Sequence, residues 1–276
     1  MERIPFGISR LDITLNGGAP RGSVVLVSGE SGAGAREFVY TAAVMNATAY
    51  TDESLFDLHY GQTAANTTLP EEIHYISFTE SYDQFVREVE LSMEDNLAQA
   101  GLERIQFKSV ADSYFRTSPV PRDWYVDENS DRTRYPGEQQ NLVNLTGDLL
   151  NERAENNLVV IDSLSDLVSA TGEQLEWPDI IYFVKGLRRV AHEWGGLILL
   201  HVDHETLTET EQGQLVDSCT GSLVFDWSTG GSVLARTLML QSFRGILSQI
   251  DEEELVKFET DLGDAGFSIS DVRKIR

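Results

Sequence analysis

A glycine-rich loop at residues 29–34 is the stretch of this 276-residue chain with the clearest chemical potential. It follows a continuous apolar segment and precedes a run of helix-forming residues. A strand, a glycine-rich loop and a helix in this order form a P-loop, whose backbone N–H groups surround the phosphates of a nucleotide. The motif is G-x-x-x-x-G-K-[ST]. Gly29 and Gly34 have its spacing, and Gly32 lies between them.

The two positions after the loop depart from the motif. Ala35 stands in place of the lysine that reaches the phosphates, and Arg36 in place of the hydroxyl that binds Mg²⁺. Each of these two charge-assisted contacts is worth roughly 1.5–3 kcal/mol. Without them, the nucleotide is expected to bind about 100-fold to 10,000-fold more weakly. Arg36 sits one position late for a phosphate contact and is expected to point toward the Mg²⁺ side. Weak ATP and Mg²⁺ binding to the loop's N–H groups stays open, whereas efficient hydrolysis is not expected.

The residues before the loop carry a specific resemblance. Residues 6–12 read F-G-I-S-R-L-D, and residues 17–23 read G-G-A-P-R-G-S. Together with the loop, this block resembles the entry into the ATPase domain of KaiC and its archaeal RecA-superfamily relatives. There, a G-I-x-x-L-D segment and a G-G-x-P-x-G-S turn precede the phosphate loop. The resemblance implies a three-layer α/β RecA-like fold with a mainly parallel central sheet, and it covers nearly the whole chain.

The pattern of apolar segments predicts the same fold class. Strands are expected at residues 73–78, 104–110, 157–163 and 196–203, and helices at 36–46, 82–99, 140–155 and 178–194. Continuous apolar strands separated by helices are typical of a parallel sheet covered on both faces. From residue 222 onward, strands at 222–227, 234–243, 256–262 and 266–270 follow one another without a long helix, which predicts an antiparallel C-terminal extension.

Residues 1–276 are expected to form a single domain, because no internal repeat is visible. Two polar segments, 47–72 and 111–139, lack a clear period and are interpreted as surface insertions. The second contains Trp124, Tyr125 and Tyr135. These aromatic residues form either a docking surface or a loop folded back onto the core.

The resemblance assigns roles to residues at two strand ends. Asp162 closes an apolar strand and matches the Walker B aspartate, which contacts Mg²⁺ in working ATPases. With the hydroxyl ligand absent, a structural role capping the following turn is the favoured interpretation. Thr79 and Glu80 match two adjacent glutamates of KaiC-like ATPases. Only Glu80 keeps a carboxylate, and a threonine cannot act as a base near pH 7.

Residues 241–245 match a late-strand K-x-R-G segment that reaches the neighbouring subunit's γ-phosphate in KaiC-like rings. Arg244 is kept and Ser242 replaces the lysine. Alternatively, Arg244 forms a surface ion pair. The nearby His201, Asp203 and His204 are a weak metal candidate because His204 is expected to point away from the other two, and no metal site is predicted. The single cysteine, Cys219, has no visible base and is interpreted as structural.

The acidic composition limits which environments and which binding partners are expected for this chain. The chain has 45 Asp and Glu against 21 Lys and Arg, a formal net charge of −24, and only four of its basic residues are lysines. Acids spread along the whole chain are typical of a protein from a salt-rich cytoplasm, where the Debye length at molar salt is about 3 Å. A mesophilic acidic protein with a basic partner is the alternative. Direct binding to nucleic acid is disfavoured. No apolar run approaches the roughly 20 residues of a membrane span.

The favoured hypothesis is a non-catalytic KaiC/RecA-superfamily protein of a halophilic archaeon, which acts in the cytoplasm through a protein partner in regulation or signalling. That partner is either unrelated or an active KaiC-like relative, so a monomer or a mixed oligomer is expected. The alternative is an atypical ATPase that uses Arg36 and Glu80. A recombinase relative that handles nucleic acid is disfavoured by the charge.

Overall fold

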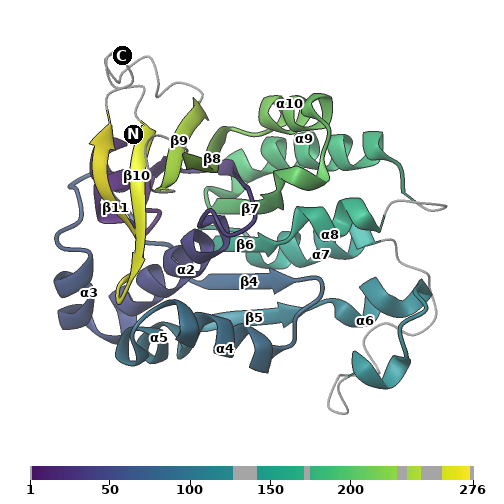
Figure 1. The fold of residues 1–276 in the computed structure, drawn as a ribbon, viewed down its shortest axis with the longest axis horizontal. Helices are drawn as coiled ribbons and strands as arrows, with labels where there is room; N and C mark the ends of the chain where they lie inside the picture. Colours follow the sequence, from purple (N-terminus) through teal and green to yellow (C-terminus); the bar gives the residue numbers. More distant parts are fainter. Residues whose placement is uncertain (1, 127–141, 171–174, 229–234, 244–256, 274–276) are drawn as a thin grey trace.

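A computed structural model describes residues 2–126, 142–170, 175–228, 235–243 and 257–273 of the chain (Figure 1). Within these residues a nine-stranded sheet has the order β11-β10-β9-β8-β3-β7-β6-β4-β5. Six strands run parallel: β5 (Ile105–Ser109), β4 (Ile73–Ser77), β6 (Leu158–Asp162), β7 (Leu197–Asp203), β3 (Ser23–Gly29) and β8 (Gly221–Ser228). The antiparallel edge is β9 (Ala235–Phe243), β10 (Lys257–Gly263) and β11 (Gly266–Arg273). A separate two-stranded sheet joins β1 (Arg3–Ile4) to β2 (Ala19–Pro20).

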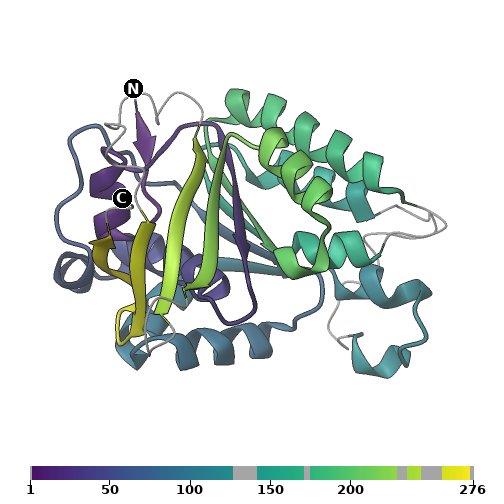
Figure 2. The same cartoon turned by 45° about the horizontal axis from the view of Figure 1, so that its top comes forward.

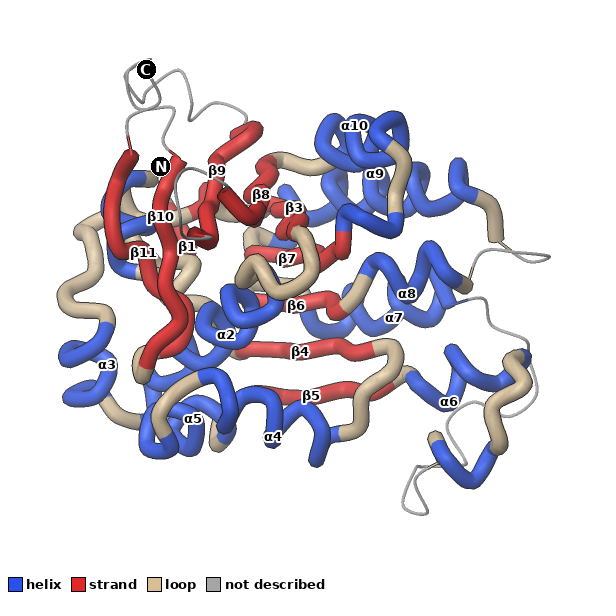
Figure 3. Tube along the Cα trace, in the orientation of Figure 1, coloured by secondary structure: helices blue, strands red, loops and turns tan. Residues whose placement is uncertain are grey.

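Helices cover both faces of the large sheet, as Figure 3 shows by colour. One apolar core packs the sheet against α1 (Ser9–Thr14), α2 (Ala35–Thr51), α3 (Glu53–His59), α4 (Tyr82–Ser92) and α5 (Asp95–Leu102). A second core packs the opposite face against α7 (Leu142–Arg153), α8 (Leu164–Ser169), α9 (Trp177–Trp194) and α10 (Glu209–Ser218). The central strands are therefore buried on both faces, which explains why they read as unbroken apolar runs. The predicted α/β architecture with its antiparallel extension is confirmed.

The antiparallel edge curls over α2 instead of continuing the plane of the parallel strands (Figure 2). Phe267 on β11 donates its backbone N–H to Thr41 Oγ1 of α2 at 2.8 Å. The Phe267 ring also meets Phe38 at a centroid distance of 5.4 Å with an interplanar angle of 83°, an edge-to-face geometry that aromatic rings favour. The last strands thus cover the first turns of the helix that follows the glycine-rich loop.

Several element boundaries differ from the expectation. The helix expected at 36–46 continues to Thr51 because it packs on the sheet, α5 and β11 and is buried on most of its surface, so no amphipathic period marks its end. Residues 53–59, expected to be irregular, form α3, whose N-cap Asp52 accepts the N–H of Leu55. The helix expected at 82–99 is two helices, α4 and α5. Helices α8 and α10 were not predicted.

The segment that begins at residue 111 starts with α6 (Ala111–Tyr114) and two 3-10 turns, Phe115–Thr117 and Arg122–Trp124. Trp124 is 79% exposed in this segment, which disfavours folding of its side chain onto the core. Tyr135 lies outside the described residues. Among the helices that the structure does describe, none combines the length and the apolar content needed to cross a bilayer.

Candidate functional site

The loop between β3 and α2 has a conformation that explains its glycines. Gly32 has φ 73° and Gly34 has φ 106°, both in the left-handed region that side chains disfavour. A Cβ added to Gly29 would come within 2.7 Å of the Ala35 Cβ, so that position has no room for a side chain. Each of these three glycines therefore has a conformational or steric reason in this loop.

Side chains from other elements hold this loop. The Trp227 indole N–H on β8 donates to the Ser31 carbonyl at 3.2 Å, and Arg236 Nε on β9 donates to the Gly32 carbonyl at 2.9 Å. The Arg236 guanidinium lies 4.7 Å from the centroid of the Trp227 ring, a cation–π contact. Glu205 Oε2 accepts the Ser31 N–H at 3.3 Å. A carboxylate of the chain itself thus takes one of the loop N–H groups that a P-loop offers to anions.

Arg36 joins the two acidic residues that the resemblance singled out. It lies in the first turn of α2, and its Nη1 is 3.2 Å from Glu80 Oε1 while its Nη2 is 3.5 Å from Asp162 Oδ1. Asp162 ends β6 and Glu80 follows the neighbouring β4, so the sheet places both carboxylates at the same edge. The structure brings Arg36, Glu80 and Asp162 together at this edge of the sheet.

Asp162 is the most enclosed member of this group. Its carboxylate is 2% exposed, Oδ2 accepts the Tyr75 hydroxyl at 2.6 Å, and Oδ1 lies 2.7 Å from His201 Nδ1. Burial alone would raise the pKa of Asp162, but His201, Arg36 and Tyr75 stabilise the anion and lower its pKa to about 2. The turn-capping interpretation is wrong, because Ser163, not Asp162, accepts the N–H of Asp166 at the start of α8.

Glu80 has the opposite electrostatic behaviour. Burial and the negative charge of Asp162 raise the pKa of Glu80 to about 7, although Arg36 lowers it. One oxygen, Oε2, is buried without a hydrogen-bond partner in the described structure. For Arg36, burial opposes the charge, yet the neighbouring acids outweigh burial and raise the pKa of the guanidinium. The cluster of one cation and two carboxylates therefore holds one proton more easily than an exposed pair of acids would.

These residues do not fit a magnesium–nucleotide complex. Mg²⁺ needs oxygen ligands in near-octahedral geometry, usually a carboxylate and a hydroxyl together with phosphates. Both Asp162 oxygens already have partners in the protein, and the Arg36 cation stands beside them. At the position of the phosphate-binding lysine, Ala35 offers only a buried methyl group. A metal bound to Asp162 would have to displace Arg36.

Among the other predicted residues that the structure describes, His201 joins this cluster through Asp162, whereas Ser242, Asp203 and His204 do not. Ser242 is half-buried on β9, and Arg244 lies outside the described residues. His201 contacts Asp162, Asp203 accepts the N–H of Glu205, and His204 lies 3.9 Å from Asp226, so the three do not converge. Cys219 is buried, in agreement with a structural role. Sequence reasoning missed Tyr75, Glu205, Trp227 and Arg236, which no short motif marks.

No family model and no curated protein sequence matches the chain. Solved structures do match it. The flagellar accessory protein FlaH from Methanocaldococcus jannaschii has a TM-score of 0.58 and 14% identity, with 95% of each chain covered. A KaiC-like protein from the hyperthermophilic archaeon Pyrococcus horikoshii OT3 has a TM-score of 0.63 and 18% identity, covering 98% of this chain and 99% of that one. Together with the strand order, these likenesses show that the chain has the same fold as these two proteins.

Proposed function

We propose that this protein is a non-catalytic member of the fold, a pseudo-ATPase that acts by binding protein partners. The observation that carries the proposal is the position of Arg36, whose guanidinium contacts both Glu80 and Asp162. In a working P-loop enzyme the metal neutralises charge at this edge and bridges the phosphates. Here the Arg36 guanidinium supplies a permanent positive charge, which offsets the negative charge of the carboxylates without a bound ion.

The surroundings of the loop support the same proposal. Glu205 already accepts a loop N–H, and Glu30 lies within the loop, so negative charge stands where phosphates would bind. Thr79 replaces the first of the two glutamates, which leaves Glu80 as the only candidate base, and Glu80 is paired with Arg36. Binding, not turnover, is the activity that these residues favour.

A protein partner fits the composition and one structural neighbour. The net charge of −24 disfavours nucleic acid and favours a basic or salt-tolerant protein surface. FlaH is described as an accessory protein of the flagellum, which favours a role beside other proteins for a chain of the same fold. We place the protein in the cytoplasm of a halophilic archaeon, in a regulatory or signalling complex that includes an active KaiC-like relative.

Calorimetry with Mg-ATP in molar potassium chloride tests whether the glycine-rich loop lacks tight nucleotide binding. The wild-type protein should bind with a Kd no tighter than about 100 μM, which corresponds to losing the lysine and metal contacts. The double variant Ala35→Lys with Arg36→Thr restores the motif and should bind at least tenfold more tightly. Arg87→Thr, on an exposed position of α4, is the matched control and should change nothing.

A low-micromolar Kd for the wild-type protein would contradict the proposal and favour the second candidate, an atypical ATPase. That candidate has one observation in its favour: the raised pKa of Glu80, about 7, suits a general base at neutral pH. Phosphate release assayed on the same samples separates the two. An active wild-type enzyme that loses turnover in Glu80→Gln would establish the atypical ATPase.

A further inference from the structure

Three neighbouring strands bring a second group of ligating side chains together: Glu30 and His204 follow the ends of β3 and β7, and Asp226 lies within β8. Strand β3 lies between β7 and β8, and Gly29 is in register with one residue of each neighbour. The residues that follow these three positions are Glu30, His204 and Asp226. One nitrogen or oxygen atom of each lies within 4.8 Å of the others, and His204 Nε2 is 3.9 Å from Asp226 Oδ1.

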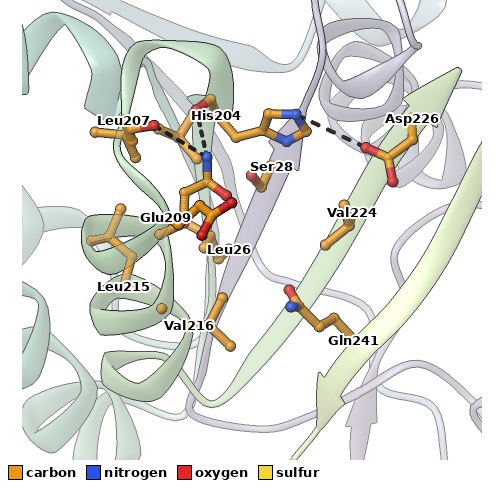
Figure 4. A pocket seen from close by; sticks show the side chains of 13 residues that line it. Leu26, Ser28, His204, Leu207, Glu209, Leu215, Val216, Val224, Asp226 and Gln241 are labelled. Atoms are coloured by element: carbon orange, nitrogen blue, oxygen red, sulfur yellow. Dashed lines mark hydrogen bonds and ion pairs between the residues drawn. The ribbon is translucent and has the colours of Figure 1, made fainter.

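This group stands at a cavity between the sheet and α10. The cavity has a volume of about 320 Å³ (Figure 4). Its polar lining includes His204, Asp226, Glu209, Gln212 and Gln241, and its apolar lining includes Leu26, Val202 and Leu215. Ser28 also lines it and is only 6% exposed. Its hydroxyl makes no hydrogen bond within the described part of the chain. Its Oγ keeps contact with solvent through the cavity, so it is a hydrogen-bonding group that a polar occupant of the cavity would meet.

The ligating side chains are held near this position by neighbours that would remain in place. Glu30 Oε2 accepts the backbone N–H of Trp227 at 3.2 Å, and Gln212 Nε2 donates to the backbone carbonyl oxygen of His204 at 2.7 Å. All three ligating side chains are half-buried. The His204 imidazole is the nearest basic group to Asp226, at 3.9 Å.

We propose that Glu30, His204 and Asp226 bind a divalent transition-metal ion, zinc by preference. One imidazole and two carboxylates form a ligand set that zinc accepts at roughly 2.0–2.2 Å, which places neighbouring ligand atoms about 3.3 Å apart in a tetrahedral site. Side-chain rotation completes the site by shortening the 3.9 Å between His204 and Asp226 by about 0.6 Å and the other spacings by at most about 1.5 Å. The fourth position faces the cavity, where a metal-bound water gives the Ser28 hydroxyl its partner. The site needs neither a nucleotide nor Arg36, and Glu30 is the residue that it shares with the glycine-rich loop.

Zinc binding to the full chain tests this site directly. Isothermal titration with ZnCl₂ at molar potassium chloride should give one ion per chain. His204→Ala should weaken the Kd at least tenfold, and Glu30→Gln and Asp226→Asn should each weaken it as well. The His204 side chain makes no other polar contact among the described residues, so its removal should leave the circular dichroism spectrum unchanged. His192→Ala, at an exposed position of α9, is the matched histidine control and should bind as the wild type does.

Cobalt provides a second readout, because a tetrahedral Co²⁺ site absorbs visible light. The wild-type protein should show these bands and quenched Trp227 fluorescence, while His204→Ala should show neither. Absence of binding at about 100 μM zinc would overturn the proposal. So would equal binding by His204→Ala, or equal losses in His204→Ala and His192→Ala, because either result would indicate non-specific binding to the acidic surface.

Discussion

Removing the positive charge of Arg36 should destabilise the protein, and more so at high pH. Arg36→Met keeps the aliphatic stem but leaves Glu80 and Asp162 as neighbouring carboxylates without their cation. At pH 6 Glu80, with a pKa of about 7, is largely protonated, so only the contact with Asp162 is lost. At pH 9 both acids are ionised in the wild-type protein, and the variant must either hold two adjacent negative charges or take up a proton.

The size of this loss follows from the geometry of the cluster. Two unit charges about 4 Å apart attract by about 4 kcal/mol at an effective dielectric constant of about 20. The Arg36 side chain is 44% exposed, whereas Glu80 is 15% exposed and Asp162 is 2% exposed. Solvent screening of the exposed guanidinium reduces the attraction, while the buried acids retain their desolvation cost. We expect a loss of about 1 kcal/mol at pH 6 and about 2–3 kcal/mol at pH 9.

Urea unfolding at both pH values and fixed molar salt measures the loss through the midpoint and slope. Arg36→Lys should recover part of the stability, because one ammonium group cannot reach both acids as the guanidinium fork does. Arg87→Met on the exposed face of α4 controls for loss of a surface charge. A loss below about 0.5 kcal/mol at pH 9, or an equal loss at both pH values, would refute the assignment of Arg36 as the internal cation.

The same site and the net charge lead to three further expected outcomes. Glu80 has its pKa raised from 4.5 to about 7, so the stability that its protonated form contributes is complete below about pH 4.5 and is lost as pH rises through 7. The free energy of unfolding of Glu80→Gln, measured with urea, should therefore equal that of the wild type at pH 4.5. At pH 8.5 it should be higher by about 1–2 kcal/mol, a value that allows for solvent screening. In Arg36→Ser, Mg²⁺ should raise the melting temperature because Asp162 becomes accessible, whereas the wild-type protein should show no Mg²⁺-specific shift against a matched KCl control. With a net charge of −24, the chain should lose native circular dichroism in about 10 mM salt, where the Debye length is roughly 30 Å, and an unchanged spectrum there would contradict this.

The fold was largely predictable because its signals are local and mutually consistent. Continuous apolar strands, a glycine-rich loop and the G-I-x-x-L-D segment all indicate the same architecture. Asp12 of that segment accepts the N–H groups of Phe6 and Gly7 and the Tyr60 hydroxyl, so its place in the pattern has a structural reason. Helix α10 was missed because only Leu215 and Ser218 are buried on it, which leaves almost no apolar period. Its capping box, Thr208 with Glu211, was the available signal.

The two candidate sites differ in how much a sequence can reveal about them. Arg36 and Asp162 occupy fixed positions of a motif, so their meeting can be inferred from the sequence alone. Glu30, His204 and Asp226 belong to no motif. They meet only because β3 lies between β7 and β8, with Gly29 in register with Asp203 of β7 and Phe225 of β8.

Strand order is tertiary information, and a parallel sheet with another order would separate these three residues by at least one strand spacing, about 4.8 Å, for each position moved. Because β3 lies between β7 and β8, the loop that follows β3 contacts side chains next to both strands. Glu205, which follows β7, accepts the Ser31 N–H, and Trp227 on β8 donates to the Ser31 carbonyl. Glu30 is therefore the residue through which an ion at the cavity would act on the loop. Its Oε2 accepts the backbone N–H of Trp227, and the indole N–H of Trp227 donates to the Ser31 carbonyl. A metal bound at Glu30 would fix the loop from β8, on the side opposite to Arg36, so the loop can be rigid at both ends with no nucleotide bound.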